Sequence, residues 1–155
     1  MKLSEFIKKY GDCEITEEME KCIKKKGKWM PEIGETYWYI DSSGSVQGIS
    51  WKNTNVDNYR RDFMRIFKTH KEIVRYLAII RACKEASFEP DWKNDKQYKW
   101  FFEWIDNDRE LNISYSFLCN NGCQFYFKSG KIMEELINKF GEKDIVKYLF
   151  NIEIN

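Results

Sequence analysis

The chain has 155 residues, of which 43% are hydrophobic and 17% aromatic, and its formal net charge is +1. This is enough apolar material for a buried core, so the composition excludes a chain that is disordered throughout. The balance of 26 basic and 25 acidic side chains argues against a strongly acidic nucleic-acid mimic and against a strongly basic nucleic-acid coat.

Composition also bears on where the protein acts. No stretch approaches the roughly 20 apolar residues of a membrane helix, and residues 1–12 lack the apolar core of a signal peptide. The five cysteines, an odd number, fit a reducing compartment. We therefore expect a protein of the cytoplasm that makes no contact with a membrane.

The first predicted elements are two short helices within residues 1–28. Residues 2–10 repeat apolar side chains at helical spacing, and Gly11 ends that pattern. Thr16 is a suitable cap for a second helix, which the basic run at 24–28 interrupts.

Residues 29–65 have a different texture. Strong β-formers at 36–41 and 46–51 flank a short Ser/Gly turn, which is typical of a β-hairpin. The polar stretch 52–65 is ambiguous between a loop and a short helical turn capped by Asp57.

A long helix follows, and its start is marked by a capping box. Thr69 occupies the N-cap position and Glu72 the third helical position. Apolar residues then recur with a period near 3.6, so we expect a helix over residues 69–86. Pro90 disfavours the helical conformation in the residue before it, which places the end near Ser87.

The rest of the chain repeats this plan with one further strand. Gly141 separates the second long helix from a last short one. The expected elements are strands at 97–106, 111–118 and 124–127, a helix at 129–140 capped by Ser129, and a short helix at 142–150.

Two matching words carry the repeat, F-K-T at 67–69 and F-K-S at 127–129. In each, a buried strand residue precedes the hydroxyl cap of a helix, so we interpret the words as structural. We expect an α+β fold of two pseudo-repeated antiparallel β-hairpin–helix units preceded by short N-terminal helices. The expected segments of this one compact domain are 1–28, 29–88 and 89–155. The side chains expected to be nearly buried are Phe67, Ile73, Leu77, Ile105, Phe127, Met133 and Ile137.

Residues 29–40 read W-M-P-E-I-G-E-T-Y-W-Y-I. Further aromatic and capping residues continue the pattern: Trp51, Asp57, Arg60, F-K-T at 67–69, F-E-P-D-W at 88–92 and K-Y-L-F at 147–150. This pattern resembles a family of small uncharacterised phage and prophage proteins from low-GC Gram-positive bacteria. Where that family has Gly-Asn before F-K-T, this chain has M-R-I at 64–66. The resemblance implies a phage or mobile-element origin, and with it a role in host takeover or against host defence.

The sequence contains no motif of a known catalytic site, such as a Gly-rich phosphate loop, G-x-S-x-G or H-E-x-x-H. His70, the only histidine, is expected at an exposed first turn of a helix. Cys119 and Cys123 bracket a turn, and a metal there would need the distant Cys13 and Cys22, so free thiols are the favoured interpretation. We expect no enzymatic activity, no metal and no cofactor.

The most suggestive polar cluster is basic and aromatic. Such a surface suits single-stranded nucleic acid or a phosphorylated ligand, and Trp, Tyr and Arg also anchor protein interfaces. An equally ordinary interpretation is internal ion pairing of its arginines with Asp57, Asp62 and the acidic second unit. The predicted partner-binding residues are Trp51, Tyr59, Arg60, Arg61, Arg65, Lys68, Lys71 and Arg75.

Two functional hypotheses follow. The first is a phage-encoded inhibitor that binds a host protein complex in the host cytoplasm, such as an anti-CRISPR protein acting on a Cas effector. The alternative is a nucleic-acid-binding or nucleotide-binding phage protein that uses residues 59–75. The corresponding region of the second unit carries Glu110, Glu134 and Glu135, so we predict that the partner meets the first unit.

Overall fold

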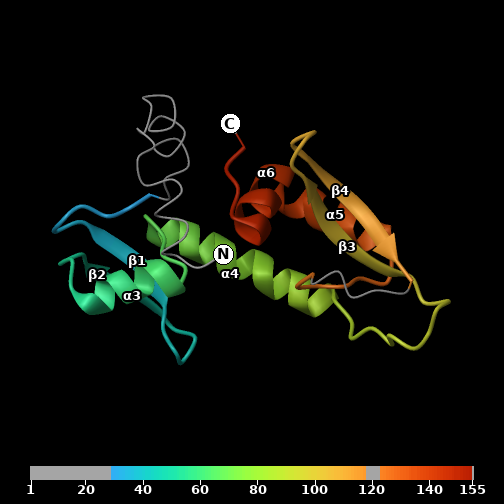
Figure 1. The fold of residues 1–155 in the computed structure, drawn as a ribbon, viewed down its shortest axis with the longest axis horizontal. Helices are drawn as coiled ribbons and strands as arrows, with labels where there is room; N and C mark the ends of the chain where they lie inside the picture. Colours follow the sequence, from blue (N-terminus) through green and yellow to red (C-terminus); the bar gives the residue numbers. More distant parts are fainter. Residues whose placement is uncertain (1–28, 118–122, 155) are drawn as a thin grey trace, which may run out of the picture. The chain divides into compact units, whose positions relative to one another are not determined.

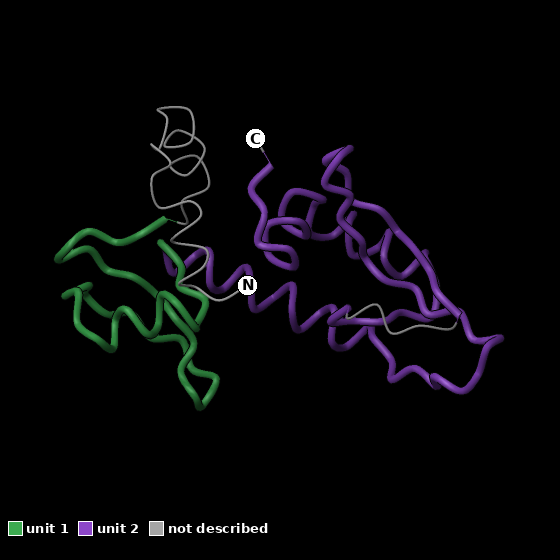
Figure 2. Tube along the Cα trace, in the orientation of Figure 1, with its two compact units in different colours: residues 1–68 green, residues 69–155 purple. Residues whose placement is uncertain are grey.

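The structure, a computed structural model, describes residues 29–117 and 123–154 (Figure 1). The chain divides into two compact units, unit 1 (residues 1–68) and unit 2 (residues 69–155), coloured green and purple in Figure 2. The described residues contain helices and antiparallel strand pairs, so the expected α+β character is confirmed. The helices expected within residues 1–28 lie outside the described residues. The sequence analysis placed the boundary between residues 88 and 89 and so grouped the helix after Thr69 with the first hairpin. In the structure this helix belongs to the second compact unit.

In unit 1, strands β1 (Thr36–Ile40) and β2 (Val46–Ser50) form an antiparallel hairpin, as the sequence predicted. The turn between them is organised by Asp41, whose carboxylate accepts hydrogen bonds from Ser43, the backbone of Ser45 and the side chain of Gln47. These hydrogen bonds lower the pKa of Asp41 to about 2.

Trp38 of β1 ties the hairpin to the end of unit 1. Its backbone N–H donates to the carbonyl of Phe67 (2.9 Å), and the N–H of Phe67 donates back to the Trp38 carbonyl (2.8 Å). The indole ring lies against Gly48 of β2, where a Cβ atom would approach the ring to 2.8 Å. Glycine is therefore required opposite Trp38, because a side chain would force the ring out of place.

The stretch that the sequence left ambiguous forms helix α3 (Asn55–Phe63). Its N-cap is Thr54, whose hydroxyl accepts from the N–H of Asp57 (3.2 Å). The Asp57 carboxylate accepts from the N–H of Thr54 in return (3.1 Å). Asp57 is thus the third residue of the helix and half of a capping box, rather than the cap that the sequence suggested.

Unit 2 begins with helix α4 (His70–Ala86). Its predicted capping box is confirmed: the Thr69 hydroxyl accepts from the N–H of Glu72, and the Glu72 carboxylate accepts from the N–H of Thr69, both at 3.2 Å. The helix ends at Ser87, as expected from the proline beyond it.

Strands β3 (Lys99–Ile105) and β4 (Glu110–Ser116) form the second antiparallel hairpin, and α5 (Gly130–Phe140) packs on it (Figure 1). The strand predicted at 124–127 is absent, and only Phe127 pairs, with Trp100 of β3. The carbonyl of Tyr126 accepts from the N–H of Phe88 (2.9 Å), so this residue bonds to the segment after α4 and not to another strand.

The second predicted cap does not form. Ser129 stands at the N-cap position of α5 with an extended backbone, but its side chain makes no capping hydrogen bond. No acidic residue occupies the first turn of α5, so the reciprocal half of a capping box is absent. Gly141, with φ of +84°, ends α5, and the last predicted helix follows as α6 (Glu142–Ile145) and a π-helical turn η1 (Val146–Phe150).

Core predictions are confirmed for Phe67, Ile73, Phe127 and Met133, which are buried. They are wrong for three side chains that remain half-buried: Leu77, Ile105 and Ile137. On α5 the buried face passes through Leu136, one position before the predicted residue, which shows that the contact face of that helix is rotated from the periodic estimate.

Candidate functional site

The predicted binding residues fall on both units. Lys71 and Arg75 lie on α4 in unit 2, and the candidate site is therefore the group in unit 1. That group consists of Trp51, Tyr59, Arg60, Arg61, Arg65 and Lys68.

A buried tyrosine and a buried carboxylate hold this part of unit 1 together. The Tyr37 side chain is fully buried, and its hydroxyl donates to Oδ1 of Asp57 at 2.8 Å. Oδ2 of Asp57 accepts from the hydroxyl of Thr54 (2.8 Å) and from the backbone N–H groups of Lys52 and Thr54 (3.1 Å each). Both carboxylate oxygens are therefore satisfied, which is the condition for burying a charge without a large loss of stability.

The hydrogen bonds to this carboxylate favour its ionised form. Burial by itself would raise the pKa of Asp57, since it disfavours the ionised form. The hydrogen bonds from Thr54, from Tyr37 and from the backbone outweigh burial and lower the pKa to about 2. Burial raises the pKa of Tyr37, although the hydrogen bond from Arg60 opposes it, so the hydroxyl stays protonated and donates to the carboxylate.

Arg60 completes the network from α3. Its Nη1 donates to the hydroxyl of Tyr37 at 3.1 Å, and its guanidinium carbon lies 4.1 Å from the centre of the Tyr39 ring. Arg60 therefore joins α3 to β1. The sequence suggested that this arginine pairs with acidic residues, whereas its partners in these contacts are Tyr37 and Tyr39. A charge reversal at Arg60 is therefore expected to destabilise unit 1.

Trp51, which we expected to be exposed, is buried with 2% of its surface accessible. Its ring meets that of Tyr37 edge-on, with centroids 5.5 Å apart. The backbone explains the inward direction, because Trp51 exchanges hydrogen bonds with Gly34 and Glu35 (2.9 Å each). Trp51 is thus a core residue of unit 1 and not a contact residue.

The remaining predicted cations of this group, Arg61, Arg65 and Lys68, lie against aromatic or acidic neighbours. Arg61 forms two hydrogen bonds with the carboxylate of Asp62, Nε to Oδ1 at 2.6 Å and Nη2 to Oδ2 at 3.0 Å. The guanidinium of Arg65 lies 5.5 Å from the centre of the Phe67 ring, and the ammonium of Lys68 lies 5.9 Å from that of Trp29.

An exposed apolar face on α3 is the feature that the sequence interpretation missed. Val56, Tyr59 and Phe63, here called the α3 stripe, recur at helical spacing and all are exposed, with Tyr59 at 58% and Phe63 at 76%. The rings of Tyr59 and Phe63 are 5.1 Å apart. Phe63 is therefore not part of the core of unit 1.

The reason is that α3 turns its polar side inward. Asp57 and Arg60 both reach the buried hydroxyl of Tyr37, so the apolar side of the helix is left facing solvent. The capping box T-N-V-D, with an arginine three residues later, was the sequence signal for this inversion. Met30 is also exposed, and its sulfur accepts a hydrogen bond from Nη1 of Arg61 at 3.7 Å.

The charge around the α3 stripe is mainly positive. Residues 51–68 contain five basic and two acidic side chains, and one of the acidic pair, Asp57, is buried. The basic side chains are Lys52, Arg60, Arg61, Arg65 and Lys68. The surface thus combines aromatic rings with net positive charge.

In unit 2, Arg75 serves that unit's own packing. Its Nε donates to Asp144 at 2.7 Å and its Nη2 to the carbonyl of Phe140 at 2.7 Å, which joins α4 to the segment where α5 ends and α6 begins. Lys71 is exposed on the first turn of the same helix.

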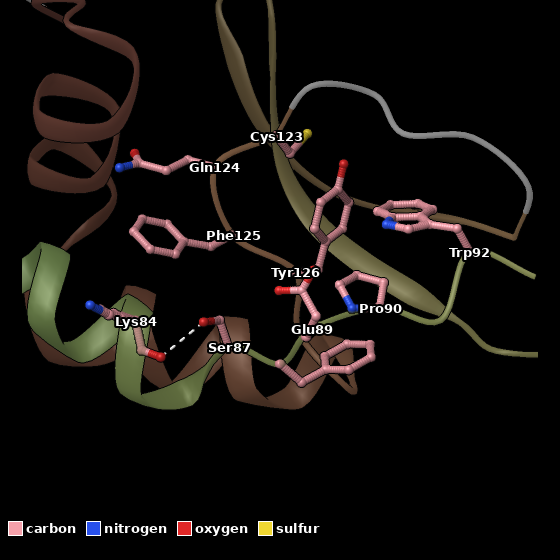
Figure 3. A pocket seen from close by; sticks show the side chains of 10 residues that line it. Lys84, Ser87, Glu89, Pro90, Trp92, Cys123, Gln124, Phe125 and Tyr126 are labelled. Carbon is pink, nitrogen blue, oxygen red and sulfur yellow. Dashed lines mark hydrogen bonds between the residues drawn. The ribbon is translucent and has the colours of Figure 1, made fainter.

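Unit 2 also contains a pocket of about 390 Å³ between the end of α4 and residues 123–126 (Figure 3). Its wall includes the rings of Trp92 and Tyr126, which meet edge-on at 5.1 Å. Burial raises the pKa of the Cys123 thiol beside them, against a hydrogen bond with Tyr126, so this sulfur is not an activated thiolate. The pocket therefore offers aromatic rings in a wall that also carries polar groups, and no activated nucleophile.

Within residues 29–117 and 123–154, no three His, Cys, Asp or Glu side chains are grouped closely enough to hold a metal ion. Cys13, Cys22 and Cys119 lie outside these residues. In the same described part of the chain, no helix combines the length and the apolar character needed to cross a membrane.

Comparisons of the chain with models of protein families, with curated proteins and with solved structures find no match. The geometry of the described residues is therefore the basis for a functional proposal.

Proposed function

We propose that the protein binds another protein through the α3 stripe of unit 1. The observation that carries this proposal is the exposed pair Tyr59 and Phe63 on a short helix surrounded by net positive charge. Tyr, Phe, Met and Arg are enriched at the centres of protein interfaces, where a few aromatic anchors supply most of the binding energy. Apolar side chains at helical spacing are also the form in which a helix lies in a partner's groove.

The partner should present an apolar groove with acidic side chains at its rim. The groove would accept Tyr59 and Phe63, and the acidic rim would meet the excess of basic side chains in residues 51–68. The hydrogen bonds of Asp57 and Arg60 to Tyr37 fix α3 on β1 before any partner arrives. A fixed helix loses less conformational entropy on binding, which favours affinity.

The resemblance to phage and prophage proteins guides the biological side of this proposal. It supports a host protein complex as the partner, in the host cytoplasm, with a defence complex such as a CRISPR–Cas effector as the leading candidate. On this proposal the protein inhibits the effector by occupying one of its surfaces, and it is a binding protein rather than an enzyme.

Nucleic acid is the second candidate for the same face. Net positive charge beside the exposed ring of Tyr59 favours it. However, the guanidinium groups of Arg60 and Arg61 are already engaged by Tyr37 and by Asp62, which reduces their use for phosphate. We therefore rank protein binding first.

The test is a double variant, Tyr59→Ala with Phe63→Ala. Both side chains are exposed, so we expect the thermal midpoint to stay close to that of the original protein. We expect the variant to lose the capture of a host complex from a lysate of a Gram-positive host and to lose inhibition of DNA cleavage by a purified Cas effector. The matched control is Val74→Ala, an exposed apolar truncation on α4 in unit 2.

Retained capture by the double variant would move the binding face away from α3. Failure of the original protein to capture any stoichiometric host protein would contradict protein binding itself. Capture of a host complex without inhibition of cleavage would leave protein binding standing and remove the Cas effector as the target.

We also infer that the two hairpins and their F-K-T and F-K-S words form a pseudo-repeat. Its support is the same backbone pairing of a first-strand tryptophan in both units, Trp38 with Phe67 and Trp100 with Phe127. If the units are equivalent, these four amide groups should be protected from hydrogen exchange to similar degrees. Protection of one pair alone would contradict the repeat.

A further inference from the structure

Unit 2 carries a cluster of contacting aromatic rings at the open end of its hairpin. Trp100 and Tyr115 are directly opposite each other in the strand register, with ring centres 4.9 Å apart. Tyr98 lies 5.2 Å from Tyr115 and 4.6 Å from Phe117. These four residues are called the ring cluster below.

The ring cluster is not part of the buried core. Tyr98 is 49% exposed and Tyr115 is 51% exposed, whereas Phe101 and Phe102 of the same hairpin are buried. Contiguous aromatic surface left in water is unusual for a folded domain and marks a binding surface. The rings also hold one another in place, so they offer fixed flat faces to a ligand.

Two lysines are close in sequence to the residues that contact Trp100 of the ring cluster. The backbone of Phe127 pairs with that of Trp100, and Gly130 lies so close that a Cβ atom there would be 3.1 Å from the Trp100 ring. The chain therefore passes beside the rings with Lys128 and Lys131 on either side of Gly130. Both lysines are exposed, and neither forms an ion pair with a described residue.

The pairing of rings with lysines identifies the class of ligand. Lysine is depleted at protein interfaces, so its presence here favours a phosphate-bearing ligand over a protein. Aromatic faces stack with nucleobases, and cations beside them meet the phosphates of the same strand. The bases of a duplex are already stacked on one another and cannot lie on the tyrosines.

We propose that unit 2 binds single-stranded nucleic acid, with bases stacked on Tyr98 and Tyr115 and the phosphate backbone beside Lys128 and Lys131. This site is separate from the α3 stripe and does not depend on the proposed function of unit 1. Its salt dependence should be shallow. A single strand contributes a slope of about −0.7 in log K against log salt for each neutralised phosphate, which gives about −1.4 for two lysines.

The experiment measures fluorescence anisotropy of a labelled oligothymidylate of about fifteen nucleotides with the full chain at about 50 mM salt. We expect Tyr98→Ala and Tyr115→Ala each to weaken binding by about tenfold. Val74→Ala is the control, because it truncates an exposed apolar side chain of α4 that belongs to neither proposed site, and it should leave binding unchanged. A duplex of the same length should bind more weakly than the single strand.

Since Tyr98 and Tyr115 contact other rings, the double variant Lys128→Gln with Lys131→Gln provides a test that leaves the ring cluster intact. It should weaken binding and remove most of the salt dependence. No binding by the original protein, equal binding of the duplex, or an equal loss in Val74→Ala would each overturn the proposal. Unchanged binding in the lysine variant would overturn it as well.

Discussion

Among the described residues, each unit buries one charged side chain, and the two charges have opposite signs. Asp57 is buried in unit 1 and Lys99 in unit 2. Asp57 is satisfied by two side-chain hydroxyls, those of Tyr37 and Thr54, and by two backbone N–H groups. The ammonium group of Lys99 donates only to backbone carbonyls, and one aromatic ring lies beside it.

The ammonium group of Lys99 has three protons, and each has an acceptor. The acceptors are the carbonyls of Asn94 (3.0 Å), Gln97 (3.1 Å) and Phe117 (2.8 Å). The ring of Trp92 lies 5.5 Å from Nζ and adds a cation–π contact. Lys99 thereby fixes the loop before β3 to the residue that follows β4.

This difference shows two ways to bury a charge at tolerable cost. The carboxylate of Asp57 accepts from two side-chain hydroxyls, so these two partners can be removed by mutation. An ammonium surrounded by carbonyls links segments of backbone, so only the lysine itself can be tested. In both cases removal leaves buried polar groups without partners, which costs more than the net value of the hydrogen bonds.

The largest effect is expected for Lys99→Met. Methionine fills similar volume but leaves three carbonyls without their donor, which should reduce the free energy of unfolding by about 3 kcal/mol. Urea unfolding measures the change, and Lys96→Met, an exposed substitution in the neighbouring loop, is the control. A change as small as that of the control would mean that water replaces the ammonium and that the two buried charges are not comparable.

Asp57→Asn should destabilise unit 1 by about 2 kcal/mol. Asparagine keeps the shape, but it loses the charge that strengthens each hydrogen bond and points an N–H₂ group at neighbouring donors. The control is Asp62→Asn, which alters an exposed pair with Arg61 and should change the unfolding midpoint negligibly. Equal effects of the two substitutions would show that burial of Asp57 carries no special weight.

The same comparison has a pH dependence. The pKa of Asp57 is about 2 in the folded chain against an ordinary value of 3.8, so its ionised form stabilises the fold above about pH 4. That contribution is lost as the pH falls from about 4 to about 2. The difference in stability between the original protein and Asp57→Asn should therefore shrink through this window. A constant difference in urea unfolding across the window would place the effect of Asn elsewhere.

Features set by near neighbours in sequence could be predicted. The hairpin at 36–51 has its turn residues and β-formers within a few positions, and the Thr69 and Glu72 capping box is three residues long. Features set by distant pairing could not. The acceptors of Lys99 are backbone carbonyls, which every residue has, so nothing in the sequence singles them out.

The α3 stripe could not be predicted for a related reason. The inward side of α3 is set by Asp57 and Arg60, whose partner Tyr37 lies about twenty positions earlier in the chain. That distant partner reverses the helix and exposes Phe63. Trp51 is buried against Tyr37 as well, so one predicted contact residue is in the core. Tyr59 alone among the predicted aromatic contacts stays exposed.

The smallest effects concern the helix caps, and they extend the contrast between side-chain and backbone partners. Thr54 both caps α3 and donates to Asp57, and Thr69 caps α4, so Thr54→Ala and Thr69→Ala should each cost about 1 kcal/mol, with the larger loss at Thr54. Ser129 makes no capping hydrogen bond, and Ser129→Ala should change the free energy of unfolding negligibly. Urea unfolding with amide exchange at the first turn of each helix measures all three.

Because the words F-K-T and F-K-S look alike in sequence, equal losses at Thr69 and Ser129 would mean that Ser129 caps α5 in solution and that the two words are equivalent. Unequal losses would mean that the likeness extends to the paired phenylalanine and stops before the cap.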